Sequence, residues 1–358
     1  MKRYLKYDVM RILSISMVLM VHVTAYIIIP LLEPGHTFES AYILSAIGNG
    51  LARFAVPVFM MMSGALVLNE EKKSTPMQFY RTALRWMFLI YLFWLIVYGL
   101  FYSQVLPYDT SFVDYLLSFQ GSYPHLWYLH FVLLFYLAAP LLRQIVKKEN
   151  GRMIGFTILA CLGLSFIGSA FKLITLLTGH KTYVGTYHVE IYANFIALIL
   201  AGWYLDNHCL SKFWKRTIYS LGALSMVVIV AVTWFQYELV EEGGLLDFVS
   251  EAFTIPAALY GIAVFSLVKD VCGAKATESG LVRKLSELSF GVYIIHVFFL
   301  EWITCFLWPF DPASHQPLVY ILAVWILVGA ASILCAFILS KIKFVKKLIY
   351  CKSKPLVN

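Results

Sequence analysis

Charged residues are scarce in this sequence. Only 13% of its 358 residues are Asp, Glu, Lys or Arg, whereas 61% are hydrophobic. An average soluble domain has about twice that charged fraction. Apolar runs of about twenty residues, long enough for a helix to cross a bilayer, recur along the whole chain. The composition therefore excludes an ordinary soluble domain and predicts an all-α polytopic membrane protein.

Paired cysteines and soluble-sized segments are also lacking. The six cysteines, at positions 161, 209, 272, 305, 335 and 351, form no CxxC pair, so neither a disulfide framework nor a zinc site is indicated. The longest segments between apolar runs, 104–125 and 269–287, are too short for a soluble domain. The first apolar run is too long for a removable signal peptide and has no small-residue cleavage site. Any chemistry is therefore expected among the helices.

The apolar runs predict about ten transmembrane helices. We expect an N-terminal tail at 1–8, a ten-helix membrane domain at 9–341 and a basic C-terminal tail at 342–358. The predicted spans are 9–31, 44–68, 83–103, 126–144, 153–175, 188–206, 217–236, 249–268, 288–308 and 318–341.

The lysines and arginines predict the orientation. Of the 28, 25 lie on one side of the membrane if the N-terminus is cytoplasmic. Cytoplasmic segments carry such an excess, so we expect both termini in the cytoplasm of a multi-pass protein of the inner (plasma) membrane. The net charge of +8 then reflects topology and contact with anionic membrane lipid, and it does not indicate nucleic acid.

Four of the ionisable residues in the predicted spans are counted to a similar depth: His22, Arg53, His296 and Glu301. Counted from the cytoplasmic ends, they lie at depths of about 12–22 Å, so we expect them near one layer. A charge at such depth is costly unless it faces a partner or a wet cavity, which makes each a functional candidate. Structural alternatives stay open: hydrogen bonding between helices for His22, packing for His296, and a buried Arg53–Glu301 pair.

The first span has a pattern of its own. Arg11 and His22 are eleven residues apart, so both side chains point to one helix face, about 16 Å apart along the axis. Asp8, three residues before Arg11, lies near the same line. The alternative for Arg11 is an interfacial anchor whose charged end reaches the headgroups.

Two further pairs lie at predicted ends of spans. His125 and Trp127 occupy the outer end of the fourth span, where they are either ordinary interfacial residues or contacts for a molecule from outside. Arg81 and Arg85 form a basic face at the cytoplasmic end of the third span, as either a topogenic pair or an anion site.

Several stretches together resemble the bacterial acyltransferase 3 family of integral membrane acyltransferases. Arg11 and His22 resemble its Arg-x10-His signature, and RFAVPVFMMMSG at 53–64 resembles its Arg followed by Pro-Phe-Phe-x-x-Ser-Gly, with Met60 in place of the second Phe. HLWYL at 125–129, followed by APLLR at 139–143, is similar to its helix-4 region. SFGVYIIH at 289–296 is similar to its late Ser-x-Gly-x-Tyr-x-x-His segment.

The resemblance covers nearly the entire chain and indicates the stand-alone type, without the periplasmic hydrolase-like domain of some members. It implies transfer of an acyl group, usually acetyl, from cytoplasmic acyl-CoA to a hydroxyl of a cell-surface glycan or a lipid-linked sugar. Acetyl-CoA is then a substrate, and no permanently bound cofactor or metal is expected. One departure is Arg81-x-x-x-Arg85, where some members have a tighter Arg-x-x-Arg.

On this chemistry, His22 is the expected general base or, alternatively, the residue that carries the acyl group. The other candidates are Arg11, Asp8, Arg81 and Arg85 for the donor; Arg53, Glu301 and His296 for the oxyanion or the cavity; and His125 and Trp127 for the acceptor. A rival interpretation is a transporter or exporter of a glycan or small solute, because buried charges among ten helices also suit a carrier. Carriers often have halves related by repetition, and the sequence shows no such repeat.

Overall fold

A computed structural model describes residues 3–28, 31, 39–69, 74–107, 111–117, 125–178, 189–239, 253–311, 316–343 and 345–349. Within these ranges the chain is helical apart from short links and one isolated bridge between Tyr4 and Ala276. Ten of its helical segments are long and apolar enough to cross a membrane. This confirms an all-α, multi-pass membrane protein.

Each span overlaps a predicted one. Six are α1 (Leu5–Ile28), α7 (Trp127–Ile145), α10 (Val189–Asn207), α11 (Lys212–Leu239), α13 (Ile255–Cys272) and α15 (Pro317–Leu339). Four are composite: α2–α3 (Ser40–Ala52, Ala55–Val67), α4–η2–α5 (Pro76–Phe79, Tyr80–Leu84, Arg85–Gln104), η3–α8 (Lys148–Asn150, Gly151–Thr178) and α14–η4 (Gly280–Trp302, Ile303–Leu307). Two short helices are α6 (Phe112–Leu117) and α16 (Val345–Ile349).

Some helices begin earlier than the apolar runs indicated, because capping residues start them. Ser279 caps α14 by accepting a hydrogen bond from the Val282 amide. Thr75 and Gln78 form a capping box at α4, with Pro76 in the first turn. The polar first turns lower the local hydropathy. The apolar runs therefore predicted these two starts about seven and eight residues too late, at 83 and 288.

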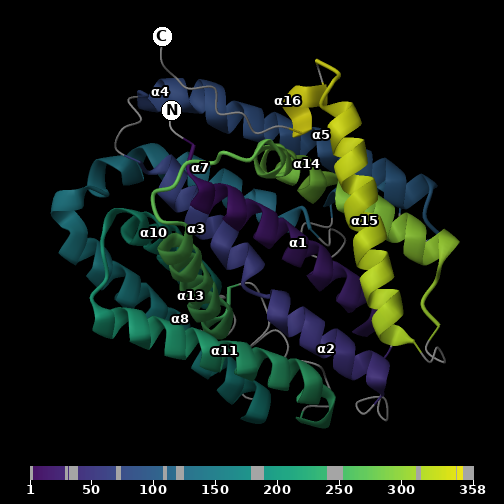
Figure 1. Cartoon of the computed structure of the whole chain (residues 1–358), viewed down its shortest axis with the longest axis horizontal. Helices are drawn as coiled ribbons and strands as arrows, with labels where there is room; N and C mark the ends of the chain where they lie inside the picture. Colours follow the sequence, from purple (N-terminus) through teal and green to yellow (C-terminus); the bar gives the residue numbers. More distant parts are fainter. Residues whose placement is uncertain are drawn as a thin grey trace.

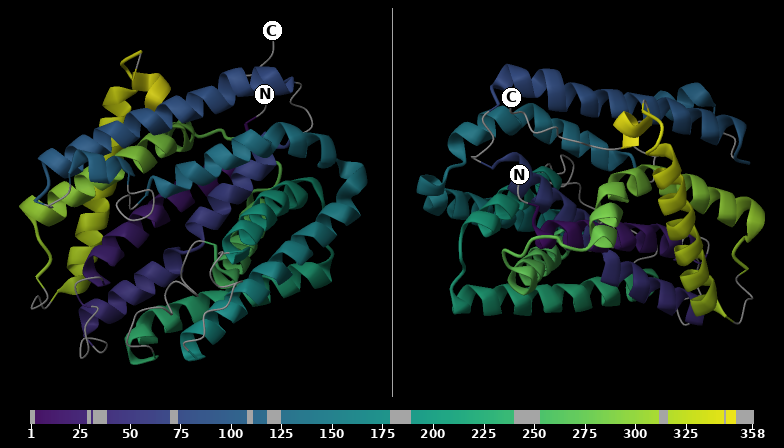
Figure 2. Two further views of the ribbon diagram at one scale, coloured as in Figure 1. Left: turned by 180° about the vertical axis from the view of Figure 1, so that it is seen from behind. Right: turned by 45° about the horizontal axis from the view of Figure 1, so that its top comes forward.

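Helix α1 occupies the centre of the bundle (Figure 1), where it packs against α2, α3, α14 and α15. One hydrophobic core involves α1, α5, α14 and α15, and a second involves α3, α7, α10 and α13. Figure 2 shows α5 running along α14, and the Tyr98 hydroxyl of α5 donates to the Ile294 carbonyl of α14. The central helix therefore contributes to both cores, and residues on it are well placed for a shared internal site.

The second span is broken between α2 and α3, although the sequence indicated one continuous helix. Pro57 has no amide hydrogen, so the carbonyl of Arg53, four residues earlier, loses its helical partner. The break falls at Arg53 and Phe54. It places Arg53 at a helix end deep in the bundle.

Close packing around α3 relies on small residues. A Cβ added at Gly64 would lie 2.0 Å from the Ile199 carbonyl oxygen, and one at Gly202 would lie 1.9 Å from that of Met61. Helices α3 and α10 therefore approach to backbone contact, as small residues allow in membranes. The run Met60-Met61-Met62 is buried there, consistent with a packing role.

The ends of the bundle carry different residues. One end, which we call the N-terminal face, holds residues 3–8 and the links 74–76, 146–150, 208–211 and 273–279. Backbone hydrogen bonds join Leu5 to Lys275 and Thr277 to Arg3. The Lys269 ammonium donates to the His208 carbonyl on the same face. This is the face that the lysines and arginines predict to be cytoplasmic.

Candidate functional site

Three histidines from separate parts of the chain meet inside the bundle. His22 lies in α1, His296 in α14 and His125 just before α7. The ring centroids of His22 and His296 are 5.1 Å apart, and those of His125 and His296 are 5.2 Å apart. His125 and His296 are buried, whereas His22 keeps some accessible surface. His125 was expected at an outer interface, yet it lies in this internal cluster.

Three ring nitrogens of this histidine cluster are buried without a hydrogen-bond partner. His296 Nδ1 lies 2.7 Å from the Tyr293 carbonyl oxygen, which can only accept, so Nδ1 carries the proton and Nε2 has a free lone pair. Nε2 of His296 and both ring nitrogens of His125 form no hydrogen bond. A buried unpaired polar atom costs about 1–3 kcal/mol, so three of them together indicate a place for a polar ligand.

Two tyrosines hold His125 in place. The Tyr293 hydroxyl donates to the His125 carbonyl oxygen at 2.5 Å, and the Tyr98 ring meets the His125 ring edge-on at 4.7 Å. The backbone and ring of His125 are therefore fixed while its ring nitrogens stay unpaired.

Arg53 reaches the cluster from the break between α2 and α3. Its Nε donates to Asn49 Oδ1 at 2.7 Å, and Asn49 Nδ2 donates to the Thr24 hydroxyl and to the Val21 carbonyl of α1. These bonds tie the broken helix to the turn of α1 that carries His22. The Arg53 charge lies within electrostatic range of the His22 ring.

A second polar group lies beyond the cluster, away from the N-terminal face. Glu301 is five residues after His296 in α14, and it accepts a hydrogen bond from the Tyr102 hydroxyl at 2.5 Å. Cys305 Sγ lies 3.7 Å from the other carboxylate oxygen. Arg53 thus bonds to Asn49 and Glu301 to Tyr102, and these two residues, both in the described part of the chain, form no ion pair with each other.

Asp8 lies at the centre of a network on the N-terminal face. Its carboxylate is fully buried and accepts from Arg3 at 2.7 and 2.8 Å, from Thr277 at 2.6 Å and from Ser286 at 2.6 Å. Its hydrogen bonds raise the pKa of the Arg3 guanidinium. Arg11 lies 3.6 Å away and is about one-third exposed. The enclosed Asp8 is therefore suited to positioning Arg11, and the accessible Arg11 to meeting an anion.

Arg81 and Arg85 lie on the outside of the bundle. Both are exposed, and Arg85 begins a stripe of exposed apolar residues along α5 that includes Leu89, Leu92 and Ile96. An arginine at the end of such a lipid-facing stripe is typical of an interfacial anchor. Their placement therefore favours lipid contact over donor binding.

Trp127 points away from the histidine cluster, although it follows His125 by two residues. Its ring packs against Phe131 and against Phe253, which precedes α13. Of this predicted pair, only His125 lies among the other candidates.

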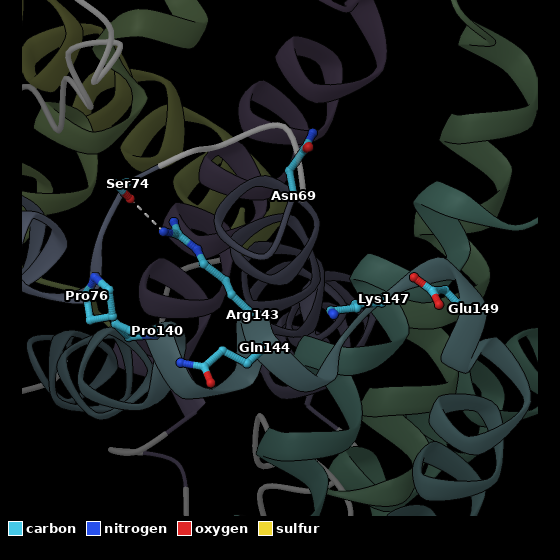
Figure 3. A pocket seen from close by; sticks show the side chains of 8 residues that line it. All are labelled: Asn69, Ser74, Pro76, Pro140, Arg143, Gln144, Lys147 and Glu149. Atoms are coloured by element: carbon cyan, nitrogen blue, oxygen red, sulfur yellow. Dashed lines mark hydrogen bonds between the residues drawn. The ribbon is translucent and has the colours of Figure 1, made fainter.

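A polar pocket of about 390 Å³ opens at the N-terminal face (Figure 3), between the link from α3 to α4 and the junction of α7 with η3. The sequence motifs did not indicate a pocket here, although Pro140 and Arg143 belong to the APLLR stretch at 139–143. Its lining is Asn69, Ser74, Pro76, Pro140, Arg143, Gln144, Lys147 and Glu149.

Sequence reasoning missed several supporting residues, chiefly Asn49, Tyr98, Tyr102 and Tyr293. Asn49 carried a signal, because an amide inside an apolar span, four residues before Arg53, is expected to pair across helices. Tyr293 also carried one, as the tyrosine of the SFGVYIIH segment at 289–296, whereas Tyr98 and Tyr102 carried none, because 23 tyrosines are spread along the chain. Within the described ranges no group of His, Cys, Asp or Glu side chains is arranged to hold a metal ion, the three histidines included.

These features define a polytopic membrane protein with a polar, histidine-lined site among its helices. Comparison with protein families supplies the class of activity. Residues 4–341 match the family described as an acyltransferase domain, so the chain belongs to the acyltransferase 3 family. No curated protein and no solved structure matches the chain. The family resemblance inferred from the motifs is thereby confirmed.

Proposed function

We propose that this protein is an O-acyltransferase that moves an acyl group, most simply acetyl, from acyl-CoA to a hydroxyl of a cell-surface glycan or lipid-linked sugar. The family match supports acyl transfer. The observation that carries the mechanism is the contact of His22 with His296, beside three unpaired ring nitrogens. In a membrane-spanning bundle such a cluster needs a polar occupant, which an acceptor hydroxyl and a thioester provide.

His22 is the general base of the proposed reaction. The acceptor oxygen attacks the thioester carbonyl carbon while His22 takes its proton, and a tetrahedral oxyanion forms. The intermediate collapses, the carbon–sulfur bond breaks, and the CoA thiolate takes the proton back from His22. The Arg53 charge, within range of His22, is placed to stabilise the oxyanion.

His296 positions His22. A general base that takes a proton on one ring nitrogen needs the other nitrogen held as a donor. The His296 tautomer, set by the Tyr293 carbonyl, offers its Nε2 lone pair for that purpose. The two rings are neighbours, with centroids 5.1 Å apart, although no hydrogen bond joins them in the structure. His296 also suits a role in the cavity that holds the acceptor.

Donor and acceptor approach from opposite ends. Arg11 lies on the His22 face of α1 about 16 Å nearer the N-terminal face, a separation similar to the length of a pantetheine arm. A guanidinium there suits a phosphate of a cytoplasmic acyl-CoA. The groups at the other end, His125, Tyr102 and Glu301, suit the hydroxyls of a sugar arriving from the outside.

A two-part experiment tests this function. Membranes containing the protein should consume acetyl-CoA in the presence of a surface-glycan acceptor, and membranes with His22→Ala should not. Mass spectrometry of glycans from a deletion strain should show loss of the acetyl increment, restored by the wild-type gene. The proposal is contradicted, and a carrier is favoured, if wild-type membranes consume no more acyl-CoA than the His22→Ala control and the glycans of the deletion strain are unchanged.

A further inference from the structure

The polar pocket at the N-terminal face has a prearranged cation. Arg143 Nε donates to the Val67 carbonyl at 2.8 Å and its Nη1 to the Ser74 hydroxyl at 2.9 Å. The guanidinium carbon lies 4.5 Å from the centroid of the Phe79 ring. These contacts fix the guanidinium plane and use two of its five N–H donors, so others are available to a ligand. A planar cation held in this way is suited to phosphate oxygens.

The remaining lining also suits an anion. Figure 3 shows Pro76 and Pro140 on one side, Lys147 and Glu149 on the other, and Arg143 with Gln144 between them. Of the described lining residues, two are cations and one is a carboxylate, which leaves one net positive charge, and the Asn69 and Gln144 amides add donors and acceptors. A polar pocket of about 390 Å³ is large enough for a nucleotide-sized group.

The pocket is connected to the histidine cluster by one face of α7. Tyr128, Val132, Tyr136 and Arg143 follow each other at helical spacing, so they lie on one side of the helix. Tyr136 contacts Phe79 beneath Arg143, with centroids 5.5 Å apart. At the other end Tyr128 contacts Tyr293, with centroids 5.6 Å apart.

A seam of partly exposed side chains accompanies this face. Tyr128 and Tyr136, together with Met17 of α1 and Phe59 of α3, pack against both hydrophobic cores and are fully buried in neither. The two cores therefore meet along residues that keep accessible surface. Tyr128 and Arg143 are fifteen positions apart, or about 22 Å along the axis, which is comparable to an extended pantetheine arm.

We infer that the pocket beside Arg143 binds the phosphate-bearing nucleotide end of the acyl donor, and that the seam along α7 leads the pantetheine arm to the histidine cluster. This inference rests on the proposed function. It moves the main phosphate contact away from Arg11 and from the exposed Arg81 and Arg85, and leaves Arg11 as a contact further along the arm.

Charge-changing variants of exposed lining residues test the pocket without disturbing the bonds of Arg143. Lys147→Gln should raise the KM for acyl-CoA about tenfold, the loss expected for one charge-assisted contact, and leave kcat within about twofold. Glu149→Gln should lower the KM, because it removes a carboxylate that repels phosphate. The matched control is Lys148→Gln, an exposed neighbour outside the lining, which should change neither constant.

Two comparisons identify the source of the phosphate. Desulfo-CoA, which lacks the thiol, should bind the purified wild type in neutral detergent and bind Lys147→Gln more weakly. If a phospholipid headgroup occupies the pocket instead, Lys147→Gln changes the binding of phosphatidylglycerol vesicles and leaves desulfo-CoA affinity unchanged, which overturns the inference. The inference is also overturned if wild type turns over acyl-CoA and the kinetic constants of all three variants equal those of wild type. Absence of any acyl-CoA binding or turnover by wild type counts against the proposed function itself.

Discussion

At the residue scale, the histidine cluster differs from the network around Asp8 in how its polar atoms are satisfied. Asp8 accepts four hydrogen bonds from three side chains, and Asn49 joins two helices through its amide. In the histidine cluster, by contrast, buried ring nitrogens of His125 and His296 are left without partners. Full satisfaction suits a structural role, whereas unpaired atoms at membrane depth suit contact with a ligand.

The first prediction concerns His22. His22→Gln keeps a similar size and hydrogen-bonding capacity but cannot take a proton as imidazole does. We expect transfer to fall by about 10²–10⁴-fold, as for loss of a general base, and more only if His22 itself carries the acyl group. Acyl-CoA binding and the unfolding temperature should stay near wild type. Turnover with a verified acceptor measures the effect, and near-normal turnover would make His22 structural.

The second prediction concerns His296. His296→Asn retains a donor for the Tyr293 carbonyl but removes the Nε2 lone pair beside His22. We expect kcat to fall at least about tenfold with little change in the KM for either substrate, because positioning of a base affects the chemical step. The control is His130→Asn, since His130 bonds to Tyr91 outside the cluster. Equal losses in the two variants would indicate a packing effect.

The third prediction concerns Asp8 and separates a positioning residue from a donor ligand. Asp8→Asn leaves Arg3 and Arg11 without a buried counter-charge, so we expect a loss of about 2–3 kcal/mol of stability. Glu287→Gln is the matched control, because Glu287 also bonds Arg3 but is one-third exposed, and should cost under about 1 kcal/mol. Thermal unfolding in detergent measures both. Unchanged stability of Asp8→Asn, with a raised KM for acyl-CoA, would return Asp8 to direct donor binding.

At the element scale, length and hydropathy predicted the spans well, because a bilayer leaves few alternatives to apolar helices. They could not predict which helices touch. The contact of α1 with α14 brings together residues 274 positions apart, His22 and His296, and nothing in periodicity encodes it. The break beside Arg53 could have been predicted from Pro57, because a proline has no N–H to donate to the carbonyl four residues before it. The links between helices are least predictable. The acidic loop at 238–251 is predicted to face outward, and its residues 240–251 lie outside those that the structure describes.

The fourth prediction concerns that break. Pro57→Ala restores an amide that can bond to the Arg53 carbonyl, so α2 and α3 should become more continuous and Arg53 should move relative to His22. We expect kcat to fall several-fold while the unfolding temperature stays the same or rises, since a helix-breaking residue is removed. Turnover and thermal unfolding are measured together. A normal kcat would show that the catalytic geometry does not depend on the break.

At the scale of the whole molecule, the two proposed substrates require a defined orientation of the protein in the membrane. The network around Asp8, the polar pocket and Arg11 all belong to the N-terminal face, whereas Glu301 and Tyr102 lie toward the opposite one. The distribution of lysine and arginine predicts that the N-terminal face is cytoplasmic. That orientation gives acyl-CoA the face with the cations and gives an external sugar the face with the carboxylate.

The last prediction tests this orientation with two single-cysteine variants. Cys209 is exposed on the N-terminal face, between α10 and α11, and Asp311 is exposed after η4 at the opposite end. In cells with a permeable outer envelope, a membrane-impermeant maleimide should label a cysteine placed at position 311 directly, and should label Cys209 only after the plasma membrane is lysed. The reverse pattern would put Arg11 and the Arg143 pocket outside the cell, where no acyl-CoA pool exists. The donor assignments would then fail together, even if His22 were shown to be essential, because the cations would face the wrong compartment.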